Sequence, residues 1–212
     1  MNIKPGQPVA ILFLCLSAAI AQGAIAQDAV DQSADQPGSH ERSRFYLGAV
    51  LGSGSGETEF DGYGTVTQDM DTRLRALSLG LILRSDARFE MSFTSVSADF
   101  DDAAGDDEFS GLDFTFRVPF GHHRVKPFLA AGLGFYTWED TAWLFEDDKD
   151  LNGLAINLAG GVLIGAHRHF EFEAGYEFKS ISWQRVRVLG SNQDVDITST
   201  MGNLYVSARV KF

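Results

Sequence analysis

The stretch Asp148–Gly153 has the residue types and the spacing of a calcium-binding loop. Asp148, Asp150 and Asn152 stand at alternate positions before a glycine. This is the first half of a pattern that surrounds Ca²⁺ with hard oxygen ligands around a sharp bend. A glutamate would complete the ligand set at the twelfth position, but that residue is Ala159. Asp148, Asp150 and Asn152 are therefore candidate calcium ligands, and an acidic surface loop is the competing interpretation.

The other side chains that could do chemistry lack the partners they need. Histidines lie in short polar stretches that are far apart in sequence: His122, His123, His167 and His169. Solvated turns account for them better than a transition-metal site does. An enzyme acting on lipid would need a serine activated by a histidine, and Ser191 has no histidine near it in the sequence. We therefore expect no catalytic site and, apart from the candidate Ca²⁺, no cofactor.

The chain is acidic, with 29 Asp and Glu against 17 Lys and Arg and a net charge of −12 at pH 7. Most of the acids fall in four polar connectors between apolar segments. Such connectors repel nucleic acid and attract cations or basic partners, so no nucleic-acid partner is expected. The competing explanation is that charge keeps surface loops soluble.

The amino terminus has the features of an export sequence. Residues 1–26 combine a positive start at Lys4, an apolar run at residues 9–21 and a small-x-small cleavage site, which together predict a signal peptide. The single cysteine, Cys15, lies inside the apolar run, so the exported chain has no disulfide. Residues 27–42 are polar and aperiodic, which predicts a flexible periplasmic leader.

The carboxyl-terminal segment alternates strictly between apolar and polar residues. The apolar set occupies the even positions: Leu204, Val206, Ala208, Val210 and Phe212. A period of two predicts a β-strand with one apolar face and one polar face. Because an aromatic residue ends the strand and cations lie on its other face, the segment suits a barrel whose outer face meets lipid.

The same alternation recurs at about residues 45–53, 77–83, 89–94, 112–120, 129–135, 154–164 and 170–178. The connectors alternate in length, being long at 57–71, 101–111, 139–152 and 184–199 and short in between. An even number of strands of about ten residues, with short turns at one rim and long loops at the other, is typical of membrane barrels. The sequence therefore predicts an all-β fold, an eight-stranded antiparallel transmembrane up-and-down β-barrel over residues 43–212.

A soluble barrel would show the same alternation with the apolar face turned inward. The terminal aromatic residue, the alternating connector lengths and the aromatic residues at strand ends favour the membrane barrel. We expect the aromatic residues to form belts at the two membrane interfaces. One belt holds Trp138, Trp143 and Trp183 near the long loops, and the other holds Phe89, Phe120, Phe128, Phe170 and Phe212.

In these strands, connector lengths and the terminal Phe212, the chain resembles the small eight-stranded outer-membrane β-barrels, the family of outer membrane protein A-like, X-like and opacity-type surface proteins. The resemblance implies a monomer in the outer membrane of a Gram-negative bacterium, in contact with outer-membrane lipids and lipopolysaccharide. It also implies that Phe212 is the assembly signal read by the barrel-assembly machinery. Because the chain stops at Phe212, no periplasmic peptidoglycan-binding domain is expected.

The role within that family stays open at this point. We expect a structural or adhesin-like role, in which acidic extracellular loops meet an unidentified extracellular partner. A narrow or gated ion-conducting pore is the alternative. A lipid A-modifying enzyme comes third, because the sequence offers no serine with a neighbouring histidine.

Four charged residues share the inward phase of their strands and lie near the short-turn rim: Glu90, Arg117, Glu173 and Arg209. Neighbouring strands then give two Glu–Arg pairs, with Glu171, Glu177 and Lys211 at the margins. An isolated charge in a confined interior is costly, so we expect a lumen charge network joined by hydrogen bonds. The competing interpretation is that each group is hydrated separately in a wet interior.

Overall fold

A computed structural model describes part of the chain, namely residues 44–62, 64–100, 106–121, 124–139, 150–187 and 194–212. The predicted signal peptide (1–26) and leader (27–42) lie outside the described residues. No helix among the described residues is long and apolar enough to cross a membrane.

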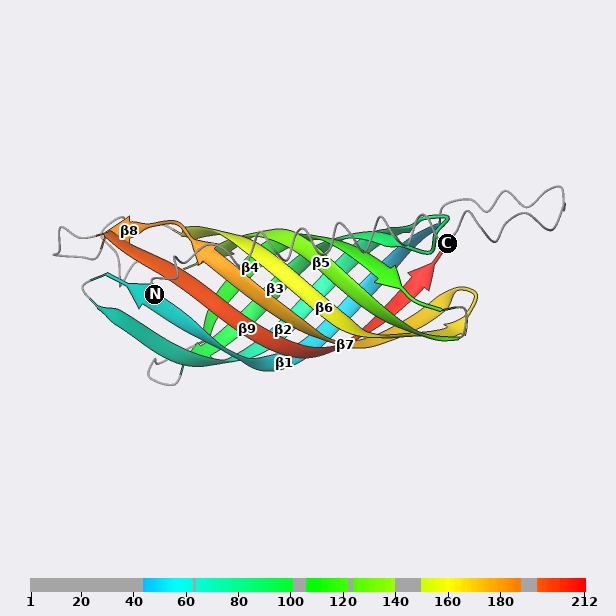
Figure 1. The fold of residues 1–212 in the computed structure, drawn as a ribbon, viewed down its shortest axis with the longest axis horizontal. Coiled ribbons are helices and arrows are strands. Elements are labelled where there is room, and N and C mark those ends of the chain that lie inside the picture. Colours follow the sequence, from blue (N-terminus) through cyan, green and yellow to red (C-terminus); the bar gives the residue numbers. More distant parts are fainter. Residues whose placement is uncertain (1–43, 63, 101–105, 122–123, 140–149, 188–193) are drawn as a thin grey trace, which may run out of the picture. The chain divides into compact units, whose positions relative to one another are not determined.

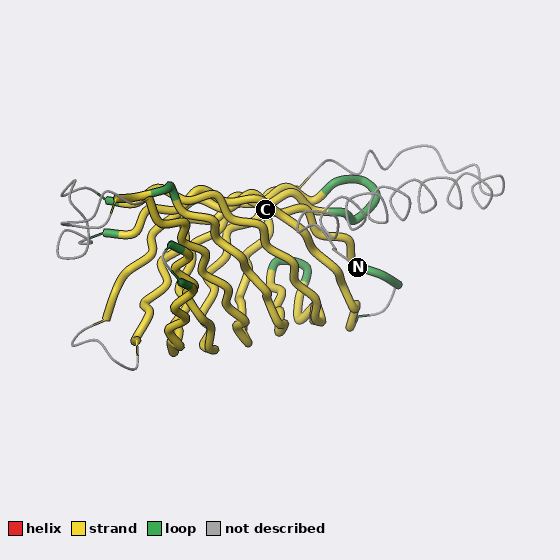
Figure 2. The backbone as a smooth tube through the Cα atoms, turned by 60° about the vertical axis from the view of Figure 1, so that its left-hand side comes forward, coloured by secondary structure: helices red, strands yellow, loops and turns green. Residues whose placement is uncertain are grey.

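The described residues form eight long strands and one short one. The long strands are β1 (Arg44–Asp61), β2 (Thr65–Ile82), β3 (Arg88–Phe100), β4 (Asp106–Pro119), β5 (Val125–Trp138), β6 (Leu151–His167), β7 (Phe170–Trp183) and β9 (Asp194–Lys211). The two-residue β8 (Val186–Arg187) pairs with the start of β9. Neighbouring long strands are antiparallel, and they make up nearly all of the described chain (Figures 1 and 2).

The sheet closes because β9 pairs with β1 as well as with β7. This last seam runs from Tyr46 opposite Lys211 to Asp61 opposite Asp196. Beyond it, the backbone N–H of Phe212 donates to the carbonyl of Phe45 at 2.9 Å. Closure leaves the ring of long strands without a free edge. The predicted eight-stranded antiparallel up-and-down barrel is confirmed.

The strands are longer than predicted. β1 and β2 continue through most of the expected connector 57–71 and pair as far as Asp61 opposite Thr65. Likewise β9 begins at Asp194, inside the expected connector 184–199. These parts of the prediction were wrong because the polarity of the two strand faces reverses near the long connectors. A strand recognised by apolar residues on its outward face is therefore missed in that region.

In the half of the barrel next to the short turns, the outward side chains are apolar and exposed. Leu77 and Leu204, for example, keep 68% and 69% of their surface exposed. The other exposed apolar side chains in this band include Phe45, Leu47, Leu51, Leu79, Phe89, Phe93, Leu129, Leu133, Phe135, Leu154, Ile164, Phe172, Phe178 and Val206. Water disfavours so large a contiguous apolar surface, whereas bilayer hydrocarbon accommodates it.

In the half next to the long connectors, the outward side chains are polar. The change is abrupt, and the first polar outward residues of β2–β6 form one row of cross-strand neighbours: Arg75, Ser95, Ser110, Thr137 and Asn152. Beyond this row, which we call the boundary row, exposed acids dominate the outer face of β1–β4. They are Glu57, Glu59, Asp61, Asp69, Asp71, Asp99 and Glu108.

The interior reverses at the same level. The inward neighbours directly beyond the boundary row are Val96, Phe109, Trp138 and Leu151, all buried and paired across β3–β6. Trp138 and Trp183 pack with ring centroids 5.6 Å apart, and Phe109 lies 5.0 Å from Trp138. This half of the barrel therefore resembles a soluble protein, with an apolar core inside a polar wall.

The predicted aromatic belts are correct at one rim only. Trp138 and Trp183 are 2% and 5% exposed and point into the apolar core, and Trp143 lies outside the described residues. Phe128 also points inward, with Arg117 over its ring at 5.0 Å. The remaining members of the short-turn belt are exposed as expected: Phe89, Phe120, Phe170 and Phe212. The strand ends that carry Trp138 and Trp183 lie beyond the apolar band, where the outer face is polar. The indole rings are therefore better accommodated in the apolar core.

We predict that deleting Phe212 prevents stable assembly. Its backbone closes the seam beyond Lys211, and its exposed ring ends the apolar face of β9. An unpaired sheet edge inside a bilayer is costly. Immunoblots of outer-membrane fractions should show that the truncated chain is degraded, whereas Phe212→Tyr, which keeps an aromatic ring, should accumulate. Wild-type levels of the truncated chain would contradict the prediction.

Candidate functional site

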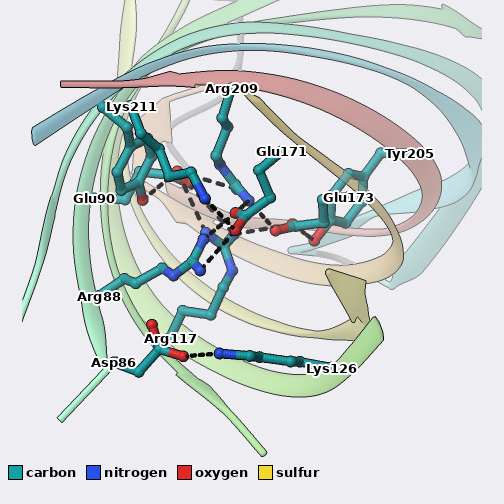
Figure 3. A network of polar contacts seen from close by, with 11 residues as sticks. Asp86, Arg88, Glu90, Arg117, Lys126, Glu171, Glu173, Tyr205, Arg209 and Lys211 are labelled. Carbon is teal, nitrogen blue, oxygen red and sulfur yellow. Dashed lines mark hydrogen bonds and ion pairs between the residues drawn. The ribbon is translucent and has the colours of Figure 1, made fainter. Parts of the chain in front are cut away.

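The structure brings the four predicted lumen residues together (Figure 3). Glu90 on β3, Arg117 on β4, Glu173 on β7 and Arg209 on β9 are each at most 4% exposed. Arg117 Nη1 donates to Glu90 Oε2 at 3.3 Å, and Arg209 Nη1 donates to Glu173 Oε2. These are the two Glu–Arg pairs expected from neighbouring strands.

Two further contacts cross the lumen and join the two pairs into the expected network. Arg117 Nη2 lies 3.2 Å from Glu173 Oε1, and Arg209 Nη2 lies 3.2 Å from Glu90 Oε2. Each guanidinium thus meets both carboxylates, because its planar fork can reach two acceptors at once. The four groups form a closed ring of alternating charge, which ties β3 and β4 to β7 and β9 across the interior.

Two tyrosines complete this ring. Tyr46 donates its hydroxyl hydrogen to Glu90 at 2.8 Å, and Tyr205 donates to Glu173 at 2.6 Å. The Tyr46 ring also lies 5.3 Å from the Arg209 guanidinium carbon. It occupies the space over Gly80, where an added Cβ would come within 2.0 Å of the ring. The inward phase of β1, in which Tyr46 precedes small residues, could have revealed this contact.

A fifth salt bridge lies at the margin of the ring. Arg88 Nη2 donates to Glu171 Oε2 at 2.9 Å, and Lys211 Nζ lies 3.5 Å from the same oxygen. Glu171 and Lys211 therefore lie at the margin, where they were expected. Arg88 was not among the predicted lumen residues, although the outward phase of Phe89 places its predecessor inward. Toward the turns, Lys126 pairs with a partly exposed Asp86.

A second polar cluster lies between the charged ring and the apolar core. Its centre is the buried Asp113, which accepts hydrogen bonds from four strands. The donors are Thr94 at 2.8 Å, Tyr136 at 2.6 Å, Asn157 at 3.2 Å and Lys179 at 2.9 Å. Glu177 was expected at the margin of the lumen charge network. It lies instead in this second cluster, 3.2 Å from the Lys179 ammonium. Because Gly134 has no side chain, Asp113 has room: a Cβ there would lie 2.3 Å from its Oδ1.

The charges of these two clusters balance. The cations are Arg88, Arg117, Lys179, Arg209 and Lys211, and the carboxylates are Glu90, Asp113, Glu171, Glu173 and Glu177. Equal numbers of opposite charges, held by hydrogen bonds from several strands, offset the desolvation of each group. The arrangement suits a structural role in the interior, because every group already has a partner within the protein.

The candidate calcium site lies only partly within the described residues. Asp148 lies outside the described residues, Asp150 is exposed, and Asn152 Oδ1 accepts a hydrogen bond from Thr137 Oγ1 at 3.5 Å. Among the described residues, no group of three or more His, Cys, Asp or Glu side chains could hold a metal ion. His167 and His169 lie side by side with ring centroids 5.8 Å apart, while His122 and His123 are not described.

Comparisons with known proteins bear on the fold. No protein-family model matches the chain, and no curated protein matches it in sequence. Among solved structures, Neisserial surface protein A matches with a TM-score of 0.53 at 18% identity, over 81% of this chain and 100% of that one. The chain has the fold of the small eight-stranded outer-membrane β-barrels.

Two other solved structures match less closely. Outer membrane protein AlkL, solved in lipid bilayers, has a TM-score of 0.49 at 8% identity, over 86% of this chain and 96% of that one. The amino-terminal barrel domain of Pseudomonas aeruginosa OprF has a TM-score of 0.40 at 13% identity, over 81% of this chain and 100% of the domain. At these identities the likeness concerns the fold alone.

We predict that Arg209→Ala lowers the free energy of unfolding by roughly 3 kcal/mol, because it leaves two buried carboxylates short of a cation. Urea titration of the protein refolded in lipid vesicles would measure the change. The control is Lys126→Ala, which removes the partly exposed ion pair with Asp86 and should cost less than about 1 kcal/mol. Equal effects of the two substitutions would contradict a stabilising role for the charged ring.

Proposed function

We propose that the protein is an integral outer-membrane barrel of a Gram-negative bacterium with a structural or surface-interaction role. The observation that carries this proposal is the reversal of polarity halfway along the strands. The exposed apolar band supports placement of the half next to the short turns in a bilayer. The polar outer face beyond the boundary row is consistent with a rigid extension of the barrel that stands outside the bilayer and presents the exposed acids.

We call the exposed acids beyond the boundary row, on the outer face of β1–β4, the acidic wall. This surface supports a partner of positive charge. Its carboxylates include residues directly opposite each other on neighbouring strands, namely Glu57 with Asp69 and Asp71 with Asp99. Like charges at such positions destabilise a sheet. A basic partner would relieve this repulsion, and the field of the wall would speed its association.

The filled interior weighs against the alternative of an ion-conducting pore. The charged ring, the Asp113 cluster and the apolar core follow one another along the barrel, and contacts in the first two reach from wall to wall. An eight-stranded barrel is narrow enough for side chains to fill it. We also propose that the protein is not an enzyme, because the charged groups of the two interior clusters are paired with one another rather than directed at an accessible site.

We predict that the purified protein shows no steady conductance in planar bilayers at neutral pH. The double substitution Arg117→Ala and Arg209→Ala removes two side chains that cross the lumen, but the apolar core remains, so this variant should stay closed as well. Discrete conductance steps from the folded wild-type protein would favour the pore. Folding would be verified by the heat-dependent shift of the band on gels.

We predict that protease added outside intact cells cuts within residues 101–111 or 139–152. The carboxyl end of β9 lies at the short-turn rim, opposite the acidic wall, and assembly of such barrels leaves this end in the periplasm. Mass spectrometry of the fragments would locate the cuts. Cleavage only at the turn that contains residues 122–123 would place the acidic wall on the periplasmic side and overturn the proposed display.

A further inference from the structure

Two exposed arginines interrupt the acidic outer wall at one place. Arg73 and Arg75 point outward from β2, and Arg75 belongs to the boundary row. The next outward residue toward the short turns is Leu77, which is 68% exposed. The next in the other direction is Asp71, which is also exposed. The arginines thus occupy the level at which the apolar band ends.

Hydroxyl groups flank both arginines. Arg73 is opposite Ser53 on β1 and Ser97 on β3, while Arg75 is opposite Ser95 on β3. Within the part of the chain that the structure describes, neither guanidinium makes an ion pair or a side-chain hydrogen bond. Two residues apart on one face of a strand, they are separated by roughly 7 Å. Asp71 lies two residues from Arg73 on the same face, but neither arginine is paired with it. An anion bound between the two guanidinium groups would reduce their mutual repulsion.

The position of the pair identifies the kind of anion. Phosphates of bilayer lipids lie at the edge of the hydrocarbon, which is the level of the boundary row in the proposed placement. Guanidinium groups bind phosphate oxygens through two parallel hydrogen bonds, and the hydroxyls of Ser53 and Ser97 can donate to the remaining oxygens. Ser95 Oγ instead donates to Glu108 Oε1 at 2.8 Å. Acids such as Asp69 and Asp71 lie directly beyond the pair. They would repel a polyanion that approached from water, whereas a lipid reaches the pair from the side of the apolar band.

We propose that Arg73 and Arg75, with Ser53 and Ser97, form a binding site for a phosphorylated lipid headgroup in the leaflet next to the acidic wall. The inference rests on the proposed membrane placement and adds a specific lipid contact to it. Exposed arginines at the opposite rim, Arg84 and Arg124, lie in separate turns and lack this paired arrangement.

The test uses the purified protein in phosphatidylcholine nanodiscs that contain lipid A as the probe. Native mass spectrometry counts the lipid A molecules that stay bound after release from the disc. We expect wild-type protein to retain lipid A, and Arg73→Gln with Arg75→Gln to lower its affinity by about tenfold or more. The matched control, Arg84→Gln with Arg124→Gln, removes the same charge from the other rim and should behave as wild type. Arg73→Lys with Arg75→Lys should retain part of the binding.

Three results would overturn the site. The first is unchanged lipid A retention in the Arg73 and Arg75 variant. The second is an equal loss in the matched control, which would reflect net charge alone. The third is inorganic phosphate that abolishes retention at concentrations comparable to lipid A, which would indicate a general anion site. Failure of the wild-type protein to enter nanodiscs would instead contradict the proposed membrane placement.

Discussion

The pairing of β1 with β9, from Tyr46 opposite Lys211 to Asp61 opposite Asp196, closes the barrel. It turns the sheet into a closed barrel, in which alternate side chains of each strand point into the lumen or away from it. Each strand can then carry an apolar face and a polar face without leaving backbone donors and acceptors unpaired at an edge. The charged ring, the apolar band and the acidic wall all presuppose this closure.

Closure also confines charged side chains in a narrow interior, where each one needs a partner of opposite charge. The small cross-section of the ring brings side chains from opposite walls within reach, so a charge on one strand meets charges from strands far away in sequence. Glu90, for instance, contacts arginines from both β4 and β9. Placing equal numbers of cations and carboxylates in this space lets each group find a partner of opposite charge within the protein.

Much of the architecture could be predicted from the sequence, because a period of two assigns the face of each residue once the strand is recognised. The positions of Glu90, Arg117, Glu173 and Arg209 followed from that rule. That these four would be joined to one another was expected as well. The particular partners across the lumen were not assigned, since they depend on the diameter of the closed ring rather than on neighbouring strands. Trp138 was placed in an interface belt because it lies near a strand end, although the alternation of β5 gives it the inward phase. The belt assumes an apolar outer face along the whole strand, and this strand passes through two environments.

The boundary row has a consequence for the position of the protein along the membrane normal. If the barrel moved outward by two residues per strand, Leu77, Leu204 and their neighbours at the top of the band would enter water. If it moved inward by the same amount, Arg75 and soon the carboxylates beyond it would enter hydrocarbon, where ionised side chains are costly. Because the boundary runs around several strands, tilting the barrel incurs both penalties on opposite sides. In the proposed placement, the chain therefore encodes its own depth and orientation in the bilayer, and the acidic wall stands at a fixed height above the lipid.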